Sequence, residues 1–309
     1  MIRYRERKGM NLSEVLEKQY FLQQTRITDP KTVAHYRRSV RRLGEMLGRP
    51  PLLSDLTDET ISGLMRWEQL RRGVAAETAN HTRKCLVALW RWCRDKELVR
   101  GGPTVQKLKV PKRRPKALTE DELRRLVEAS QHVPGTIGGL PAPTWWLTLL
   151  AIEIDTGMRA GELLALRWEW IDWERQRVDV PAEVRKGKSE DASYWLPAST
   201  LRWLAPLRQP HGLILGWARH VSRYYQLWDE LLELAGLPPG RRNKTHALRR
   251  TFATLVAANG GDPSAALGHS DPTVAKRYYL DPDATDQKHA ERIPERARPL
   301  AIARIADVG

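Results

Sequence analysis

The feature that most limits the fold of this chain is a short segment between two long helix-forming regions. Residues 101–116, GGPTVQKLKVPKRRPK, contain two glycines, three prolines and six Lys or Arg residues. Proline interrupts helices, glycine favours an open chain, and like charges repel each other. We therefore expect residues 101–116 to be a basic linker between a first domain at 1–100 and a second at 117–290, with residues 291–309 as a C-terminal tail.

The positive charge of the chain is concentrated before the end of this linker. The whole sequence of 309 residues has a net charge of +15, and residues 1–116 hold 27 Lys and Arg against 12 Asp and Glu, whereas residues 117–309 hold 25 of each. Such an asymmetry indicates that residues 1–116 bind a polyanion and that residues 117–309 have a different role. A basic protein tuned for solubility is the alternative.

The two cysteines, Cys85 and Cys93, lie in one predicted helix, a spacing that indicates neither a disulfide framework nor a zinc site. A reducing, cytoplasmic location is the simple expectation. The longest apolar run, residues 145–152, is too short to span a bilayer, so we expect no contact with a membrane.

The first region has the periodicity of a helical bundle. In KTVAHYRRSVRRLGEML, apolar residues recur every three or four positions, with arginines between them. Similar patterns predict roughly four helices in all. The basic side chains that we expect to contact DNA phosphates are Arg37, Arg38, Arg41 and Arg42 in this helix, Arg83 and Lys84 in a later one, and Lys112, Arg113 and Arg114 in the linker.

The second region indicates a mostly helical domain with a small antiparallel sheet. Thr119 and Glu122 have the spacing of a capping box, and residues 144–155 predict a buried helix. RQRVDVPA and ASYWLPA predict two short strands on either side of the hairpin tip VRKGKSED. Further helices are expected up to Gly236, from about His246 and from about Pro272.

Three short motifs in this second region carry groups suited to phosphate chemistry. TGMRAGE places Arg159 near a helix start, with Glu162 one turn later to hold its guanidinium group. HALRR places His246 and Arg249 on one helical face, where they can bind a phosphate from two sides. LGHSDPTVAKRYYL places Tyr278 nine residues after His269. Each motif alone is also compatible with a surface helix.

Together and in this order, the motifs resemble the tyrosine recombinase family, of the phage integrase type. That family has the pattern Arg, Lys, His-x-x-Arg, His, Tyr, which matches Arg159, His246, Arg249, His269 and Tyr278. The resemblance implies a helical, SAM-like core-binding bundle followed by a catalytic domain. The family's lysine lies on the hairpin, where Lys186 is preferred and Lys188 stays open.

Two features depart from a simple match. Tyr279 is a rival nucleophile, although the spacing from His269 favours Tyr278 and indicates a packing role for Tyr279. The interval from Arg249 to His269 is 20 residues, about one helical turn shorter than usual for the family. Loss of a whole turn preserves the facing of the later residues, so we expect the site to survive.

The resemblance implies a site-specific recombinase that forms a 3′-phosphotyrosyl intermediate on double-stranded DNA, without a metal, a cofactor or ATP. Tyr278 would be the nucleophile, Arg159 and Arg249 would hold the phosphate, and Lys186 would protonate the leaving oxygen. His246 would serve as acid or base and as hydrogen-bond donor, and His269 would form a hydrogen bond to the phosphate. A tetramer on two DNA sites is expected. The alternatives are an inactive DNA-binding protein of the same fold and a type IB topoisomerase.

Overall fold

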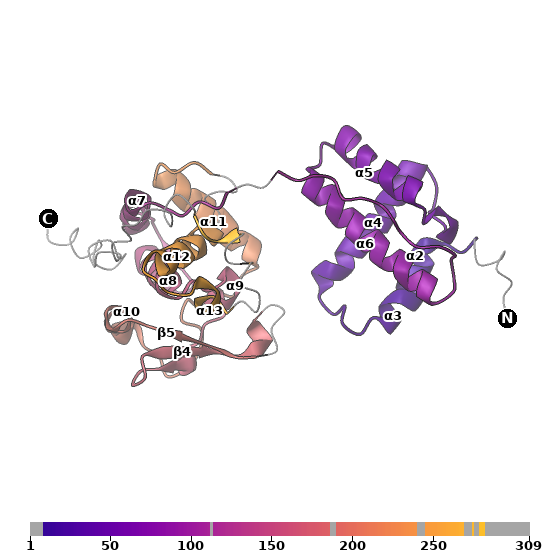
Figure 1. The fold of residues 1–309 in the computed structure, drawn as a ribbon. Helices are drawn as coiled ribbons and strands as arrows, with labels where there is room; N and C mark the ends of the chain where they lie inside the picture. Colours follow the sequence, from indigo (N-terminus) through magenta and orange to yellow (C-terminus); the bar gives the residue numbers. More distant parts are fainter. Residues whose placement is uncertain are drawn as a thin grey trace. The chain divides into compact units, whose positions relative to one another are not determined.

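The chain forms two compact units, Met1–Lys112 and Arg113–Gly309. The computed structural model describes residues 9–111, 114–185, 190–239, 245–268, 274 and 278–281. Figure 1 shows a helical first unit and a second unit in which a small sheet lies at one side of a group of helices. The division falls inside the predicted linker at 101–116.

The first unit is a bundle of helices joined by short loops. Its core contains side chains with no exposed surface, among them Leu43, Ile61 and Leu86. Asp29 caps the long helix α4 by accepting a hydrogen bond from the backbone of Lys31, and Thr57 caps α5 in the same way. The elements are α2 (Leu12–Val15), the π-helical η1 (Leu16–Tyr20), α3 (Phe21–Gln23), α4 (Pro30–Leu47), η2 (Leu53–Asp55), α5 (Asp58–Arg72) and α6 (Ala76–Asp95).

The first half of the predicted linker lies along this bundle. The Asp58 carboxylate accepts hydrogen bonds from the backbone N–H groups of Thr104 (2.8 Å) and Val105 (3.1 Å). The side-chain amide of Asn80 bonds both backbone groups of Leu108, and the Val105 side chain is buried. Residues 104–108 are therefore part of the surface of the first unit.

The second unit confirms the expected class, mainly helical with a small antiparallel sheet. The sheet has the strand order β3-β4-β5, and the predicted hairpin is the β4–β5 pair, in register from Arg177 opposite Trp195 to Val180 opposite Ala192. The elements are α7 (Glu120–Gln131), β1 (Thr136–Ile137), β2 (Leu140–Pro141), α8 (Ala142–Thr156), α9 (Ala160–Leu164), η3 (Trp168–Trp170), β3 (Ile171–Asp172), β4 (Arg177–Val180), η4 (Ala182–Val184), β5 (Ala192–Trp195), α10 (Ala198–Leu204), η5 (Ala205–Leu207), α11 (Val221–Leu234), α12 (His246–Ala258) and α13 (Pro263–Ala266).

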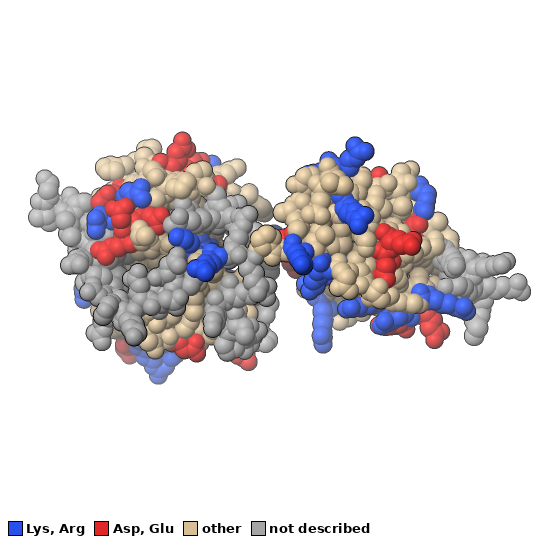
Figure 2. Space-filling view, turned by 45° about the horizontal axis from the view of Figure 1, so that its top comes forward, with Lys and Arg blue, Asp and Glu red and all other residues tan. Residues whose placement is uncertain are grey.

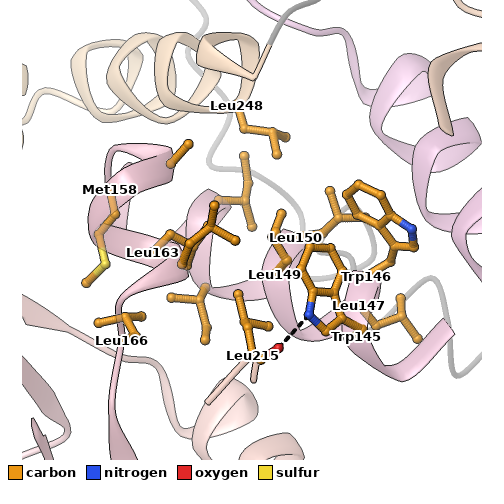
Figure 3. Close-up of a cluster of buried hydrophobic side chains, with 14 of the residues drawn as sticks. Trp145, Trp146, Leu147, Leu149, Leu150, Met158, Leu163, Leu166, Leu215 and Leu248 are labelled. Atoms are coloured by element: carbon orange, nitrogen blue, oxygen red, sulfur yellow. Dashed lines mark hydrogen bonds between the residues drawn. The ribbon is translucent and has the colours of Figure 1, made fainter. Parts of the chain in front are cut away.

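Helix α8 lies in the core of the second unit, as its apolar sequence predicts. Trp145 and Trp146 are fully buried, and the Trp145 indole Nε1–H donates to the backbone oxygen of Leu215 (2.7 Å), which Figure 3 shows. This bond satisfies a polar atom that burial would otherwise leave without a partner. Neither α8 nor any other helix in the described residues is long and apolar enough to cross a membrane.

A sharp turn at Gly157 connects α8 to the short helix α9. Gly157 has φ +61°, the left-handed conformation that favours glycine. A Cβ atom at this position would stand 2.3 Å from the Phe252 ring and 3.0 Å from the Leu267 side chain. Only glycine therefore fits between α8, α12 and the end of α13.

We expect Gly157→Ala to destabilise the second unit by about 2–4 kcal/mol, because the new methyl group overpacks the contact with Phe252 and the left-handed backbone is strained. Differential scanning calorimetry of the full chain measures the change. Gly161→Ala is the matched control, since a Cβ there meets nothing within 4 Å and alanine is the better helix former. Equal melting temperatures for the two variants would contradict this account of the turn.

Candidate active site

Arg249 lies at the centre of the candidate site. Its side chain on α12 is fully buried, although arginine is rarely buried without hydrogen-bond acceptors. The guanidinium group donates through Nη1 to the backbone oxygen of Gly157 and through Nη2 to that of Leu267 (3.2 Å). The turn after α8 and the end of α13 thus hold Arg249 in place.

Arg159 approaches from the other side of the same turn. It is the N-cap of α9, and its Nη1 donates to Oε1 of Glu162 (3.0 Å) while its backbone N–H donates to Oε2 (3.3 Å). Glu162 is buried, whereas the Arg159 side chain remains 23% exposed. The predicted support of Arg159 by Glu162 is therefore present, with the open part of the guanidinium group facing out of the protein.

The two guanidinium groups are close enough to influence each other. Burial, followed by the nearby charge of Arg159, lowers the pKa of Arg249. Arginine stays protonated in proteins, so two cations meet at this place. Like charges brought together are costly unless an anion is bound between them. The arrangement is suited to a phosphate.

His246 stands at the first turn of α12, one helical turn before Arg249, as the sequence predicts. Its ring reaches solvent at the surface, yet the surrounding protein lowers its pKa by desolvation, and the charges of Arg249, Arg250 and Arg159 lower it further. The lowered pKa favours the neutral imidazole, which is able to accept a proton.

The segment that carries the candidate nucleophile is described at residues 278–281. The side chain of Tyr278 is 54% exposed, whereas the ring of Tyr279 lies 5.3 Å from the Arg249 guanidinium carbon. Thr254 fixes the segment by donating to the Tyr279 backbone oxygen (3.3 Å) and accepting from the Asp281 backbone N–H (3.0 Å). In this conformation Tyr279 is thus the tyrosine whose ring contacts the arginine pocket.

Three predicted residues, Lys186, Lys188 and His269, lie outside the described residues, and so do Lys112 and Arg113 of the linker. The roles assigned to these five side chains remain predictions. Of the helix expected from Pro272, only residues 274 and 278 are described, and both are helical.

The described basic residues of the first unit and the linker differ in their exposure and in their partners within the protein. Arg37, Arg38, Arg41, Lys84 and Arg114 are exposed, and Arg41 pairs with Glu45 (3.4 Å). Arg37 pairs with Glu17 (2.7 Å), Arg42 pairs with the buried Glu68 (2.5 Å), and Arg83 donates to the backbone oxygen of Val105. Arg42 and Arg83 therefore also stabilise the bundle. On the face in Figure 2, Lys and Arg side chains stand at several places on this unit, with acidic side chains between them.

Two buried side chains near the arginines were not predicted. Tyr194 on β5 donates to Oε2 of Glu162 (3.3 Å), and Glu153 on α8 is 1% exposed. Burial raises the pKa of Glu153 well above its usual range, although the charge of Arg249 opposes this. The alternation of β5 could have marked Tyr194 as inward, but the sequence gives no sign of its partner. Among the described residues, no group of three or more His, Cys, Asp or Glu is placed to hold a metal ion.

Comparison with known sequences places this arrangement in context. A model described as the phage integrase family matches residues 116–285, a range that includes every candidate residue from Arg159 to Tyr278. A tyrosine recombinase XerC from Brucella melitensis is 26% identical over 280 residues, which cover 82% of this chain and 84% of the relative. A tyrosine recombinase XerA from Thermococcus onnurineus is 28% identical over 202 residues, which cover 62% and 65%.

Solved structures share the fold at low sequence identity. The Tn1549 transposon integrase in complex with a circular intermediate DNA has a TM-score of 0.72 at 15% identity, covering 87% of this chain and 95% of that chain. A lambda integrase tetramer bound to a Holliday junction has a TM-score of 0.69 at 18% identity, covering 90% and 80%. The likeness extends over both units of the chain.

We expect the His246 imidazole to titrate below 6.5 in the folded protein. The unfolded chain then binds a proton near pH 6.5 that the folded chain does not, so this group lowers stability as the pH falls below about 6.5. NMR titration of the histidine ring signals, assigned with His246→Gln, measures the midpoint. A midpoint at or above 6.5 would show that desolvation and the arginine charges do not together lower the pKa of His246.

Proposed function

The chain belongs to the phage integrase family, and we propose that it cuts and rejoins double-stranded DNA through a covalent bond from Tyr278 to a 3′ phosphate. The observation that carries this proposal is the hydrogen bond from Arg249 on α12 to the backbone oxygen of Gly157, because it ties Arg249 to the turn from which Arg159 follows two residues later. Two guanidinium groups stabilise the negative charge that develops on the non-bridging oxygens when a nucleophile attacks phosphorus.

The proposed reaction is a transfer of the phosphoryl group between two oxygens. The Tyr278 hydroxyl loses its proton and attacks phosphorus, and the bond from phosphorus to the 5′ oxygen breaks. Lys186 protonates this departing oxygen, and the neutral His246 ring accepts the proton that the Tyr278 hydroxyl loses. His269 donates a hydrogen bond to the phosphate. The phosphotyrosyl bond retains the energy of the broken linkage, so a 5′ hydroxyl of another strand reverses the reaction without ATP.

The choice of Tyr278 over Tyr279 rests on the family spacing from His269. Consecutive residues of a helix point about 100° apart, so the two phenols do not reach the same phosphorus together. In the conformation described, Tyr279 contacts Arg249 and Tyr278 is exposed. We propose that binding of DNA turns this segment, so that the phosphate replaces the Tyr279 ring and Tyr278 points inward.

The proposed partner is double-stranded DNA, bound by both units, and the proposed assembly is a tetramer on two DNA sites. The related transposon and lambda integrases were solved with DNA, one of them as a tetramer on a Holliday junction. The excess of positive charge before residue 117 supports contact with phosphates by the first unit and linker. Exposed Arg38, Arg41 and Lys84 are the side chains placed for it.

Trapping of the covalent intermediate tests the proposal. The purified protein is incubated with a pool of nicked duplexes of random sequence, in which the fragment released after cleavage diffuses away. We expect a protein–DNA adduct that survives a denaturing gel, that Tyr278→Phe abolishes and that Tyr279→Phe retains, because only Tyr278 supplies the attacking oxygen.

Three results would contradict the proposal, and each would point to a different alternative. Absence of an adduct with the wild-type protein would support an inactive DNA-binding protein. Loss of the adduct in Tyr279→Phe with retention in Tyr278→Phe would exchange the roles of the two phenols. Relaxation of supercoiled plasmid by a monomer without joining to a second DNA would indicate a topoisomerase.

A further inference from the structure

Strand β5 carries one side chain that points into the protein interior beside the candidate site. Along β5 the exposure alternates, with Tyr194 6% exposed and its neighbour Trp195 60% exposed. Tyr194 stands opposite Val178 of β4, which is also buried. The phenol ring is therefore fixed by packing, and its hydroxyl group needs a hydrogen-bond acceptor inside the protein.

The acceptor is the carboxylate that holds Arg159. Glu162 receives three hydrogen bonds: Oε1 from Arg159 Nη1 (3.0 Å), and Oε2 from the Arg159 backbone N–H (3.3 Å) and from the Tyr194 hydroxyl (3.3 Å). A carboxylate that is 1% exposed depends on such donors, because each unpaired lone pair inside the protein is costly. Tyr194 thus fixes the rotation of the group to which the Arg159 side chain is bound.

Burial and the neighbouring Glu162 carboxylate keep the Tyr194 phenol in its donor form. Burial raises the pKa of Tyr194, the charge of Glu162 raises it further, and the charges of Arg249 and Arg185 oppose these effects. Arg249 on α12 and Arg185 after η4 consequently lie near the same ring as Glu162 on α9. Tyr194 is a point at which the sheet, α9 and α12 meet.

Arg185 ties the same strand to a second part of the site. It is 5% exposed, its Nη1 donates to the backbone oxygen of Glu190, and its Nη2 lies 3.2 Å from the place of a Cβ at Gly268. Arg185 therefore joins the two arms of the hairpin to each other, and its guanidinium group lies close to Gly268 after α13. Pairing with β4 and the bond from Arg185 to Glu190, just before β5, both restrict the strand that carries Tyr194.

We propose that Tyr194 is a positioning residue that acts through Glu162 to hold the Arg159 guanidinium in the orientation that binds the scissile phosphate. The proposal deepens the function proposed above and rests on it. Tyr194 itself does not touch DNA. Its hydroxyl gives the buried carboxylate a third hydrogen bond, from outside α9, which favours one orientation of Glu162, and Arg159 follows that orientation.

Tyr194→Phe tests the proposal while keeping the ring. On a cleavable nicked duplex we expect the rate of adduct formation to fall about tenfold with the DNA dissociation constant unchanged, because the defect lies in the geometry of one phosphate contact. The matched control is Tyr224→Phe, which removes the hydroxyl of another fully buried phenol, one with no hydrogen-bond partner in the described part of the chain. This variant should cleave at the wild-type rate.

Two further measurements separate positioning from a general loss of structure. Replacing the scissile phosphate with an uncharged methylphosphonate removes most of the demand on Arg159, so we expect the penalty of Tyr194→Phe to shrink to less than about threefold. In a Glu162→Gln background, Tyr194→Phe should lower the rate of adduct formation hardly any further, because both changes break the same chain of contacts to Arg159. Equal penalties on both substrates, or independent losses in the double variant, would overturn the proposal.

A readout that needs no cleavage separates this proposal from the proposed function. NMR spectra of protein labelled with 15N-arginine report the rotation of each guanidinium group, and Arg159→Lys assigns the relevant signal. We expect Arg159 to rotate faster in Tyr194→Phe than in the wild type or in Tyr224→Phe. Unchanged rotation would refute the positioning role even if the protein cleaves DNA. If Arg159 rotates faster in Tyr194→Phe but the wild-type protein forms no adduct with DNA, the positioning of Arg159 by Tyr194 stands and the proposed function is refuted.

Discussion

The organisation of the second unit depends on the burial of one guanidinium group. Arg249 has no exposed surface, and the hydrogen bonds that compensate its desolvation come from the backbone oxygens of Gly157 and Leu267. Those oxygens are available only because Gly157 takes a left-handed turn between α8 and α9 and because α12 packs directly against that turn. The requirement to satisfy a buried cation therefore fixes three helices at one place, and the same turn delivers Arg159.

Placement of the second cation depends on a different contact. Arg159 is held by Glu162 through side chain and backbone together, and Glu162 is held by Tyr194 from the sheet. A helix end, a strand and a turn thus share one carboxylate. Backbone acceptors and shared carboxylates of this kind leave guanidinium charge available to an anion, whereas an exclusive ion pair would neutralise it.

The sequence predicted the class of fold and the elements that carry the site because these depend on local patterns. The capping box at Thr119, the buried helix α8, the β4–β5 hairpin and the start of α12 at His246 are all present. The i,i+3 relation of Arg159 and Glu162 was also correct.

The sequence did not predict the contacts between residues that are far apart in the chain. The spacing of His246 and Arg249 places them on one face of α12, but only the packing of α8 against α12 decides that Arg249 is buried while His246 reaches solvent. Tyr194 contacts a carboxylate 32 positions away in the chain, and the hairpin tip gave no sign that Arg185 would be buried. Residues 104–108 read as an open linker, yet hydrogen bonds to Asp58 and Asn80 dock them on the first unit.

The most direct test of the account is the position of the phosphate in a crystal structure of the protein joined to nicked DNA. We expect guanidinium nitrogens of Arg159 and Arg249 both to lie within about 3.2 Å of non-bridging oxygens of the phosphorus bonded to the tyrosine. A phosphate held by other side chains, with either arginine still turned toward its protein partners alone, would contradict it.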